Sequence, residues 1–247
     1  MTKAGPIPIV YDPYRQVAAC TVPANFHVHQ AQLTFEDVLA VQPQIQIVPT
    51  VDKLRAKHSP IVSVVKGMTF AYVDLTDAPE VLGSLQKSEA PDMKLDAEWS
   101  PSFTGVLYYR KKEAMTQPSE PTIHTVQARM ITQNMEDPGT GSACTGLACY
   151  LAMHESAPGQ SVREHVTSED EIVSRTEGVK IGTDDGASER PKLERHVYAI
   201  HQGLEMGRPC MIAVEVDVAI QADGTKKIAN VALSGRANFF AKGELIP

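Results

Sequence analysis

The segment that decides the fold runs from residue 136 to residue 151 and reads EDPGTGSACTGLACYL. A turn rich in glycine and proline leads directly into an apolar stretch, so the sequence predicts a helix from about Gly141 to Met153. The first N–H groups of a helix have no partner inside it, and the helix dipole places a partial positive charge there. The start of this helix is therefore a candidate site for a carboxylate or a phosphate.

Most of the remaining chain is predicted as strands. Thr34 is a good cap for one short helix, and residues 221–224 have the composition of a hairpin turn. Apolar and β-branched patterns predict strands at residues 6–10, 16–22, 61–66, 68–75, 105–110, 122–130, 196–202, 210–219 and 226–233. Because strands dominate and helices are few, the predicted fold class is α+β.

Composition excludes several functional classes. The chain has 247 residues and a net charge of −7, which allows one large domain or two small ones. The acidic balance, with no basic run between aromatic residues, argues against a nucleic-acid partner. No apolar segment approaches membrane-spanning length, and residues 1–8 lack the apolar core of a signal peptide. We expect a cytoplasmic protein with no membrane partner.

The four cysteines show no zinc-type spacing and are expected to be reduced thiols. Cys149 lies well inside the apolar helix, where a small buried side chain is expected. Cys144 lies in the first turn of that helix. A thiol near a helix start has a lowered pKa and can be reactive, which distinguishes Cys144 from Cys149.

Two motifs together resemble a known family. The block at residues 136–143, EDPGTGSA, resembles the signature of the phenazine-biosynthesis PhzF-like proteins, and so does QGLEMGRP at residues 202–209. The ending, with LSGRA at residues 233–237 and GEL at residues 243–245, is similar as well. The resemblance covers residues 60–247 well and the earlier residues loosely.

The resemblance implies a diaminopimelate epimerase-like fold of the α+β class. In that fold each of two similar halves is a curved β-sheet wrapped around a central helix, with the active site between the halves. For this chain it implies that residues 1–57 are a remnant of the first half. Residues 58–247 would form a complete second half with an insertion near residues 155–192. It also implies a homodimer.

The implied chemistry is an isomerisation by acid/base proton transfer on a small carboxylate substrate, with no cofactor and no metal. In the characterised reaction of the family, the substrate is a dihydro-hydroxyanthranilate. The family's Gly-Asn element, its Ser-Glu-Thr element with the catalytic Glu, and its Gly-His turn have no counterpart here. The resemblance thus implies an N-terminally shortened member: a truncated gene model, a splice form or a degenerate paralogue.

Three hypotheses about the chain follow from these alternatives. The first is a PhzF-like isomerase, the second a non-catalytic ligand-binding or scaffold protein, and the third a fragment that folds poorly alone. Exposed strand edges and apolar surface would accompany the third.

Asp137 is the candidate catalytic residue. Taken alone, an acid at this position is a turn or capping residue. The resemblance implies that it contacts substrate instead. The same resemblance and the small side chains make the backbone of Gly141, Ser142, Ala143 and Cys144 the expected binding site for the substrate carboxylate. The alternative is a plain helix cap that uses Thr140 or Ser142.

Cys144 occupies the position of a catalytic cysteine in related epimerases, which need a second thiol opposite it. Cys20 is the only candidate and lies on a predicted strand, so we expect a non-catalytic Cys144. Glu136 is expected to pair with a base such as Arg129. His27 and His29 share one face of a predicted strand, which permits metal binding. Without an evident third ligand, they are interpreted as ordinary surface residues.

Overall fold

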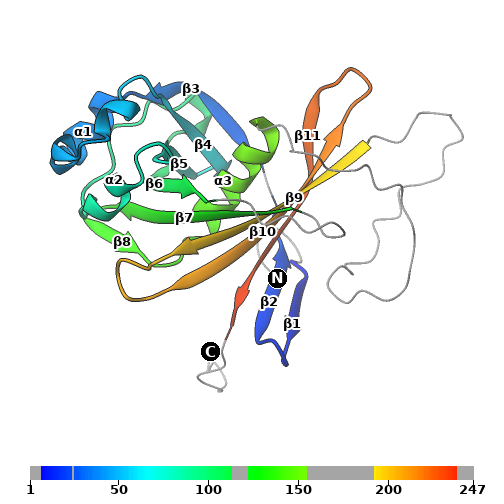
Figure 1. Ribbon diagram of the computed structural model, residues 1–247. Helices are drawn as coiled ribbons and strands as arrows, with labels where there is room; N and C mark the ends of the chain where they lie inside the picture. Colours follow the sequence, from blue (N-terminus) through cyan, green and yellow to red (C-terminus); the bar gives the residue numbers. More distant parts are fainter. Residues whose placement is uncertain (1–6, 24, 113–121, 155–191, 238–247) are drawn as a thin grey trace, which may run out of the picture.

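The computed structural model describes residues 7–23, 25–112, 122–154 and 192–237 (Figure 1). They form one mixed sheet of eleven strands together with three helices. The strands are β1 (Ile9–Asp12), β2 (Val17–Thr21), β3 (His27–Leu33), β4 (Ser59–Val65), β5 (Met68–Asp74), β6 (Phe103–Lys111), β7 (Ile123–Thr132), β8 (Met135–Asp137), β9 (Lys192–Gln202), β10 (Cys210–Ile220) and β11 (Lys226–Arg236). The helices are α1 (Phe35–Val41), α2 (Glu80–Ser84) and α3 (Gly141–His154), and three short 3₁₀ turns cover Pro43–Ile47, Val51–Leu54 and Ala97–Trp99.

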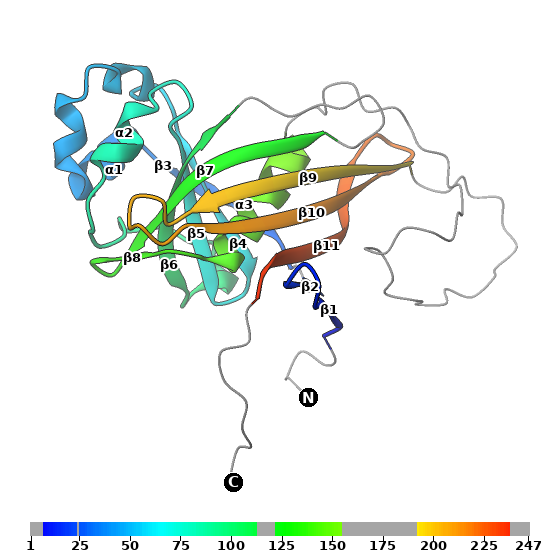
Figure 2. The same cartoon turned by 60° about the horizontal axis from the view of Figure 1, so that its bottom comes forward.

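The strand order is β1-β2-β11-β10-β9-β7-β6-β5-β4-β3. The short strand β8 lies outside this order and pairs with β7. Two pairs, β5 with β6 and β7 with β9, are parallel, and the other pairs are antiparallel. Figure 2 shows β7, β9 and β10 running side by side as long ribbons. The predicted strands along β2, β4 to β7 and β9 to β11 are confirmed.

The predicted α+β fold of two similar halves was wrong. The described strands belong to one large mixed sheet with only three short helices, not to a first and a second helix-wrapped half. The physical reason is the pairing of the three strands nearest the N-terminus among the described residues: β1 and β2 extend the sheet beside β11, whereas β3 extends it beside β4. The predicted boundary between residues 57 and 58 stays a prediction, although the sheet crosses it between β3 and β4. Residues 155–191 of the predicted insertion lie outside the described residues.

The central strands are buried on both faces. Along β4 and β5, side chains such as Val62 and Tyr72 point into the cluster around α3, whereas their neighbours Ile61 and Val73 pack with α1. This alternation follows from the two-residue period of a strand. Strands covered on both sides read as continuous apolar runs, which explains the composition of this part of the sequence.

The helix α3 lies in the core. Nine of its fourteen residues are buried, and it packs against β4 and β5 as well as β9, β10 and β11. Such a helix needs apolar or small residues all round, and the segment from Gly141 onward supplies them. The packing fixes the start of α3 beside the end of β9 (Figure 1).

Local signals in the sequence were also informative. Thr34 caps α1: its side chain accepts a hydrogen bond from the backbone of Asp37, and the Asp37 side chain accepts one from the backbone of Thr34.

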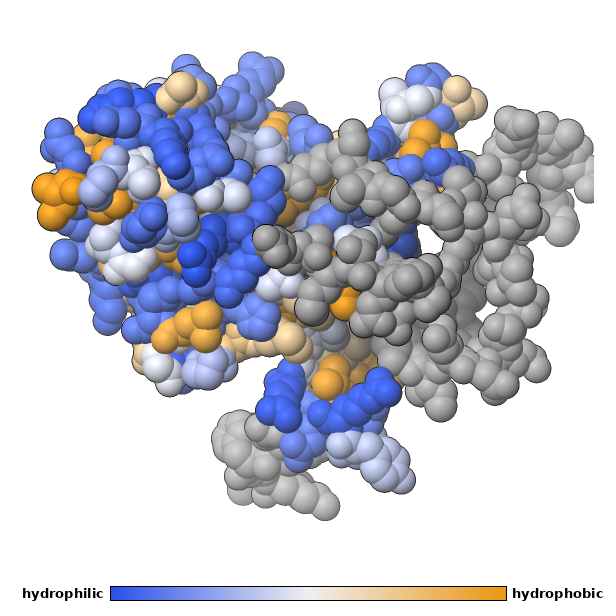
Figure 3. Space-filling view, in the orientation of Figure 1, coloured by the Kyte–Doolittle hydropathy of each residue, from blue (hydrophilic) through white to orange (hydrophobic). Residues whose placement is uncertain are grey.

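Hydrophilic residues dominate the face shown in Figure 3, with separate hydrophobic patches between them. None of the described helices has both the length and the apolar composition needed to cross a bilayer.

Candidate functional site

The site predicted from sequence lies in the turn between β8 and α3. Gln133 and Asn134, both with positive φ, reverse the chain so that β8 pairs with β7 and places Asp137 opposite Met130. The Asp137 carboxylate then closes the next turn. Its Oδ1 accepts from the Gly139 N–H at 3.1 Å, and its Oδ2 accepts from the Thr140 hydroxyl at 2.7 Å. Asp137 therefore holds the approach to the helix in one conformation.

Gln202, at the end of β9, clamps the same turn from the opposite side. Its Oε1 accepts from the Thr140 N–H at 3.0 Å, and its Nε2 donates to the Asp137 carbonyl at 2.8 Å and to the Thr140 hydroxyl at 3.1 Å. The Gln202 side chain is fully buried, and it supplies hydrogen-bond partners to the Thr140 N–H and to the Asp137 carbonyl. This role of Gln202 was not predicted from the sequence. The only signal was the Gln-Gly pair, because Gly203 has a φ of 72° and approaches Pro138 closely.

The first turn of α3 presents unpaired donors. Cys144 donates the first helical hydrogen bond, to the Thr140 carbonyl at 3.0 Å. In the described part of the chain, the backbone N–H groups of Gly141, Ser142 and Ala143 have no acceptor. Gly141 and Ser142 are half-buried and Ala143 is buried. Small side chains and free N–H groups are the features that let an anion approach a helix start.

Cys144 differs from the expectation. Its side chain is fully buried and its thiol points at the Oε1 atom of Gln202, 3.4 Å away. Burial, and then the nearby Cys210 and Asp137, raise the pKa of Cys144 well above its usual value. The predicted lowering of the thiol pKa was therefore wrong, since desolvation of the thiolate outweighs the helix dipole. Its backbone amide is already used within the helix.

We predict that the native protein reacts with a thiol reagent at no more than two sites. Cys144 and Cys149 are buried, and burial raises the pKa of Cys149 to about 12, whereas Cys20 and Cys210 are partly exposed. Titration with an aromatic disulfide at pH 8 should give four thiols only after unfolding. Cys144→Ala should leave the native count unchanged and lower the unfolded count by one. A rapidly reacting third thiol that disappears in Cys144→Ala would contradict this result.

Glu136 faces away from the turn and pairs with Arg129, as predicted. The two side chains form a bidentate ion pair, with Nε to Oε1 at 2.9 Å and Nη2 to Oε2 at 2.7 Å. Both residues are 7% exposed, and Arg129 also donates to the Leu82 carbonyl. This pair attaches β8 to β7 and thereby supports the position of Asp137.

His27 and His29 do not lie beside the turn. The interpretation of both as surface residues was wrong for His29, which is only 3% exposed because β4 and the segment around Asp96 cover it. The structure supplies the third residue that the sequence did not reveal. His27, His29 and Asp96 form a group whose possible ligand atoms all lie within 4.8 Å of one another.

A cavity of about 390 Å³ lies away from the predicted site. It is lined by residues that include Ala90, Met93, Ser102 and Thr104, and none of the predicted site residues lines it. The turn before α3 is thus a partly exposed surface site.

No family model matches the chain, and no curated protein sequence matches it either.

Proposed function

We propose that this chain is an isomerase of the PhzF-like class, in which the start of α3 holds a small carboxylate substrate and Asp137 carries the proton. The proposal needs no cofactor. Support comes from the sequence resemblance at residues 136–143 and 202–209, and from the geometry of the turn that contains Asp137.

The observation that carries the proposal is the set of N–H groups on Gly141, Ser142 and Ala143. They have no acceptor among the described residues and lie at the positive end of a buried helix of fourteen residues. A carboxylate offers two oxygens, each able to accept from two donors. Charge-assisted hydrogen bonds of this kind are roughly twice as strong as neutral ones.

Asp137 is the last residue of β8 and closes the turn that leads to these donors. Among the described residues, each of its oxygens accepts one hydrogen bond, from Gly139 and from Thr140. A carboxylate has about four acceptor positions, so the remaining ones are open to a substrate proton. A general acid or base contributes roughly 10²- to 10⁴-fold to a rate when it lies within hydrogen-bond reach of that proton.

The test is incorporation of solvent deuterium into a dihydro-hydroxyanthranilate, followed by NMR in deuterated buffer. The full chain should catalyse exchange, and Asp137→Asn should slow it by at least roughly 10²-fold. Asp223→Asn is the matched control. The Asp223 carboxylate accepts from the backbone and hydroxyl of Thr225 in a similar turn of the β10–β11 hairpin. Equal exchange rates for the two variants would contradict a catalytic role for Asp137.

A second function, non-catalytic binding of a small carboxylate, is favoured by one specific observation. Both oxygens of Asp137 already take part in hydrogen bonds that hold the turn, which is the role of a structural acid. Titration of ¹⁵N-labelled protein with anthranilate separates the two functions. Shifts of the Gly141 and Ser142 amides without any deuterium exchange would support binding alone. Exchange that depends on Asp137 would support the isomerase.

A further inference from the structure

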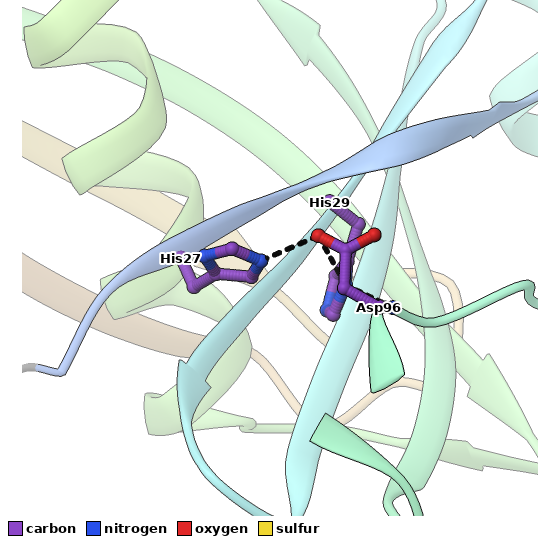
Figure 4. A group of neighbouring side chains, drawn as sticks. All are labelled: His27, His29 and Asp96. Carbon is purple, nitrogen blue, oxygen red and sulfur yellow. Dashed lines mark hydrogen bonds and ion pairs between the residues drawn. The ribbon is translucent and has the colours of Figure 1, made fainter. Parts of the chain in front are cut away.

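We propose that His27, His29 and Asp96 form a binding site for a divalent transition-metal ion such as zinc. The two histidines lie two residues apart on one face of β3, and Asp96 comes from the irregular segment that precedes β6 (Figure 4). The proposal is independent of the turn before α3, because the two sites share no residue.

The distances between the ligand atoms suit a single ion. His27 Nε2 lies 2.7 Å from Asp96 Oδ2, and His29 Nδ1 lies 3.7 Å from the same oxygen. With metal–ligand bonds of about 2.0–2.2 Å, neighbouring ligands of a tetrahedral ion are separated by about 3.3 Å. Small shifts of Asp96 and His27 in opposite directions therefore make room for the ion. The side chains of Asp96 and His27 are 28% and 32% exposed, so each has a solvent side toward which it can move.

The hydrogen bonds of His29 identify which of its nitrogens faces the site. The backbone N–H of Asp96 is directed at Nδ1 at 3.1 Å, and a backbone N–H can only donate, so Nδ1 carries a lone pair. The other nitrogen, Nε2, carries the hydrogen and donates to the Ser63 hydroxyl at 2.9 Å. Nδ1 therefore carries the lone pair that a metal ligand requires. This lone pair accepts from the Asp96 N–H in the metal-free protein, so an ion bound by Nδ1 takes the place of that N–H, which moves away when Asp96 shifts.

The partners behind His29 resemble the outer shell of a metal site. The Ser63 hydroxyl lies 2.6 Å from that of Thr69, which lies 2.8 Å from that of Ser102. A chain of three hydroxyls therefore holds the imidazole from its far side. In metal sites, the second nitrogen of a ligating histidine almost always donates to a carboxylate, a backbone carbonyl or a water, which fixes the ring. Here the Ser63 hydroxyl takes that place.

Trp99 packs against the same cluster. Its ring is stacked on His27 with centroids 4.5 Å apart and meets the edge of His29 at 6.0 Å. Lys66 lies over the face of this ring and is paired with Glu98, so its charge is partly compensated. Two imidazoles and one carboxylate, with a partly exposed side left for water, are a ligand set that suits zinc and its neighbours.

The first experiment is titration of the metal-free, untagged protein with Zn²⁺ by calorimetry and with Co²⁺ by absorption and fluorescence. Trp99 is the only tryptophan in the chain, so its emission reports on the cluster without labelling. We expect one ion per chain, intense visible absorption from Co²⁺ in a low-coordinate site, and quenching of Trp99 that saturates at the same stoichiometry. A titration without saturable one-to-one binding overturns the proposal.

Variants then assign the site to its residues. His27→Ala and Asp96→Asn change partly exposed side chains and should fold. Ser63→Ala removes the hydrogen-bond partner of His29 and should weaken Zn²⁺ binding by roughly 10- to 100-fold. His27→Ala and Asp96→Asn each remove a ligand and should weaken Zn²⁺ binding by at least the same factor. His58→Ala removes an imidazole outside the cluster, and this variant should bind Zn²⁺ as the parent chain does.

Unchanged Zn²⁺ affinity in both His27→Ala and Asp96→Asn would show that the cluster is only an ion pair between β3 and its neighbouring segment. None of these readouts depends on a substrate, so they remain informative if the isomerase proposal fails.

Discussion

Replacing Glu136 by leucine is expected to lower the free energy of unfolding by about 3–5 kcal/mol, the usual cost of breaking a buried ion pair. The substitution leaves the Arg129 guanidinium, only 7% exposed, without its carboxylate partner. What remains for that charge is its hydrogen bond to the Leu82 carbonyl and the more distant carboxylate of Glu205. The midpoint and slope of a urea unfolding curve measure the change.

The double variant Arg129→Met/Glu136→Leu tests the mechanism. It removes both charges together, so the uncompensated charge disappears and an apolar pair of similar size remains. The Leu82 carbonyl then loses its donor, which costs about 1–3 kcal/mol. We therefore expect the double variant to be more stable than Glu136→Leu, but less stable than the parent chain. A double variant that is less stable than Glu136→Leu would contradict this account.

A pair of the same chemistry that is only partly buried provides the control, since its Asp217 side chain is 16% exposed. Arg195 and Asp217 face each other across β9 and β10 with Nε to Oδ1 at 2.8 Å, and the Arg195 side chain is 49% exposed. Breaking such a pair typically changes stability by no more than about 1 kcal/mol. The contrast between Glu136→Leu and Arg195→Met therefore measures the effect of burial rather than of charge alone.

Short-range features were predictable because their signals lie within a few residues of each other. Thr34 and Asp37 form the predicted cap, and α3 begins where the turn signal of residues 136–140 ends. The pairing of Glu136 with Arg129 also follows from proximity, since the two residues lie on neighbouring strands of one hairpin. In each case the interaction is decided locally, before the rest of the fold matters.

Features that depend on distant pairing could not be read from the sequence. The parallel pairs β5–β6 and β7–β9 set the strand order, and no local pattern specifies which strands meet. The same limit hid the partners of the candidate sites: Gln202 lies 62 residues from Thr140, and Asp96 lies 67 residues from His29. Burial was hidden too, which is why a lowered pKa was expected for Cys144 although the surrounding sheet covers it.

Replacing Gly146 by alanine should destabilise the protein, although the same change stabilises most helices. In a helix interior, alanine is favoured over glycine by about 1 kcal/mol. Here a Cβ atom would lie 2.1 Å from the Tyr72 hydroxyl and 2.7 Å from Val64 Cγ2. Tyr72 is 1% exposed and its hydroxyl donates to the Ala143 carbonyl at 3.1 Å, so it cannot move without losing that bond. Overpacking and the lost hydrogen bond together cost about 2–4 kcal/mol, which outweighs the helix propensity.

Two further variants test the argument about Gly146. A Cβ added at Gly83, in α2, would have no described atom within 4 Å, so Gly83→Ala should be neutral or stabilise by up to about 1 kcal/mol. Adding Tyr72→Phe to Gly146→Ala removes the oxygen that the new methyl group would meet and should recover part of the lost stability. Thermal unfolding of the four proteins gives the comparison. If Gly146→Ala were as stable as Gly83→Ala, the close packing of α3 against β5 would be wrong, and with it the position of the helix start that presents the anion-binding donors.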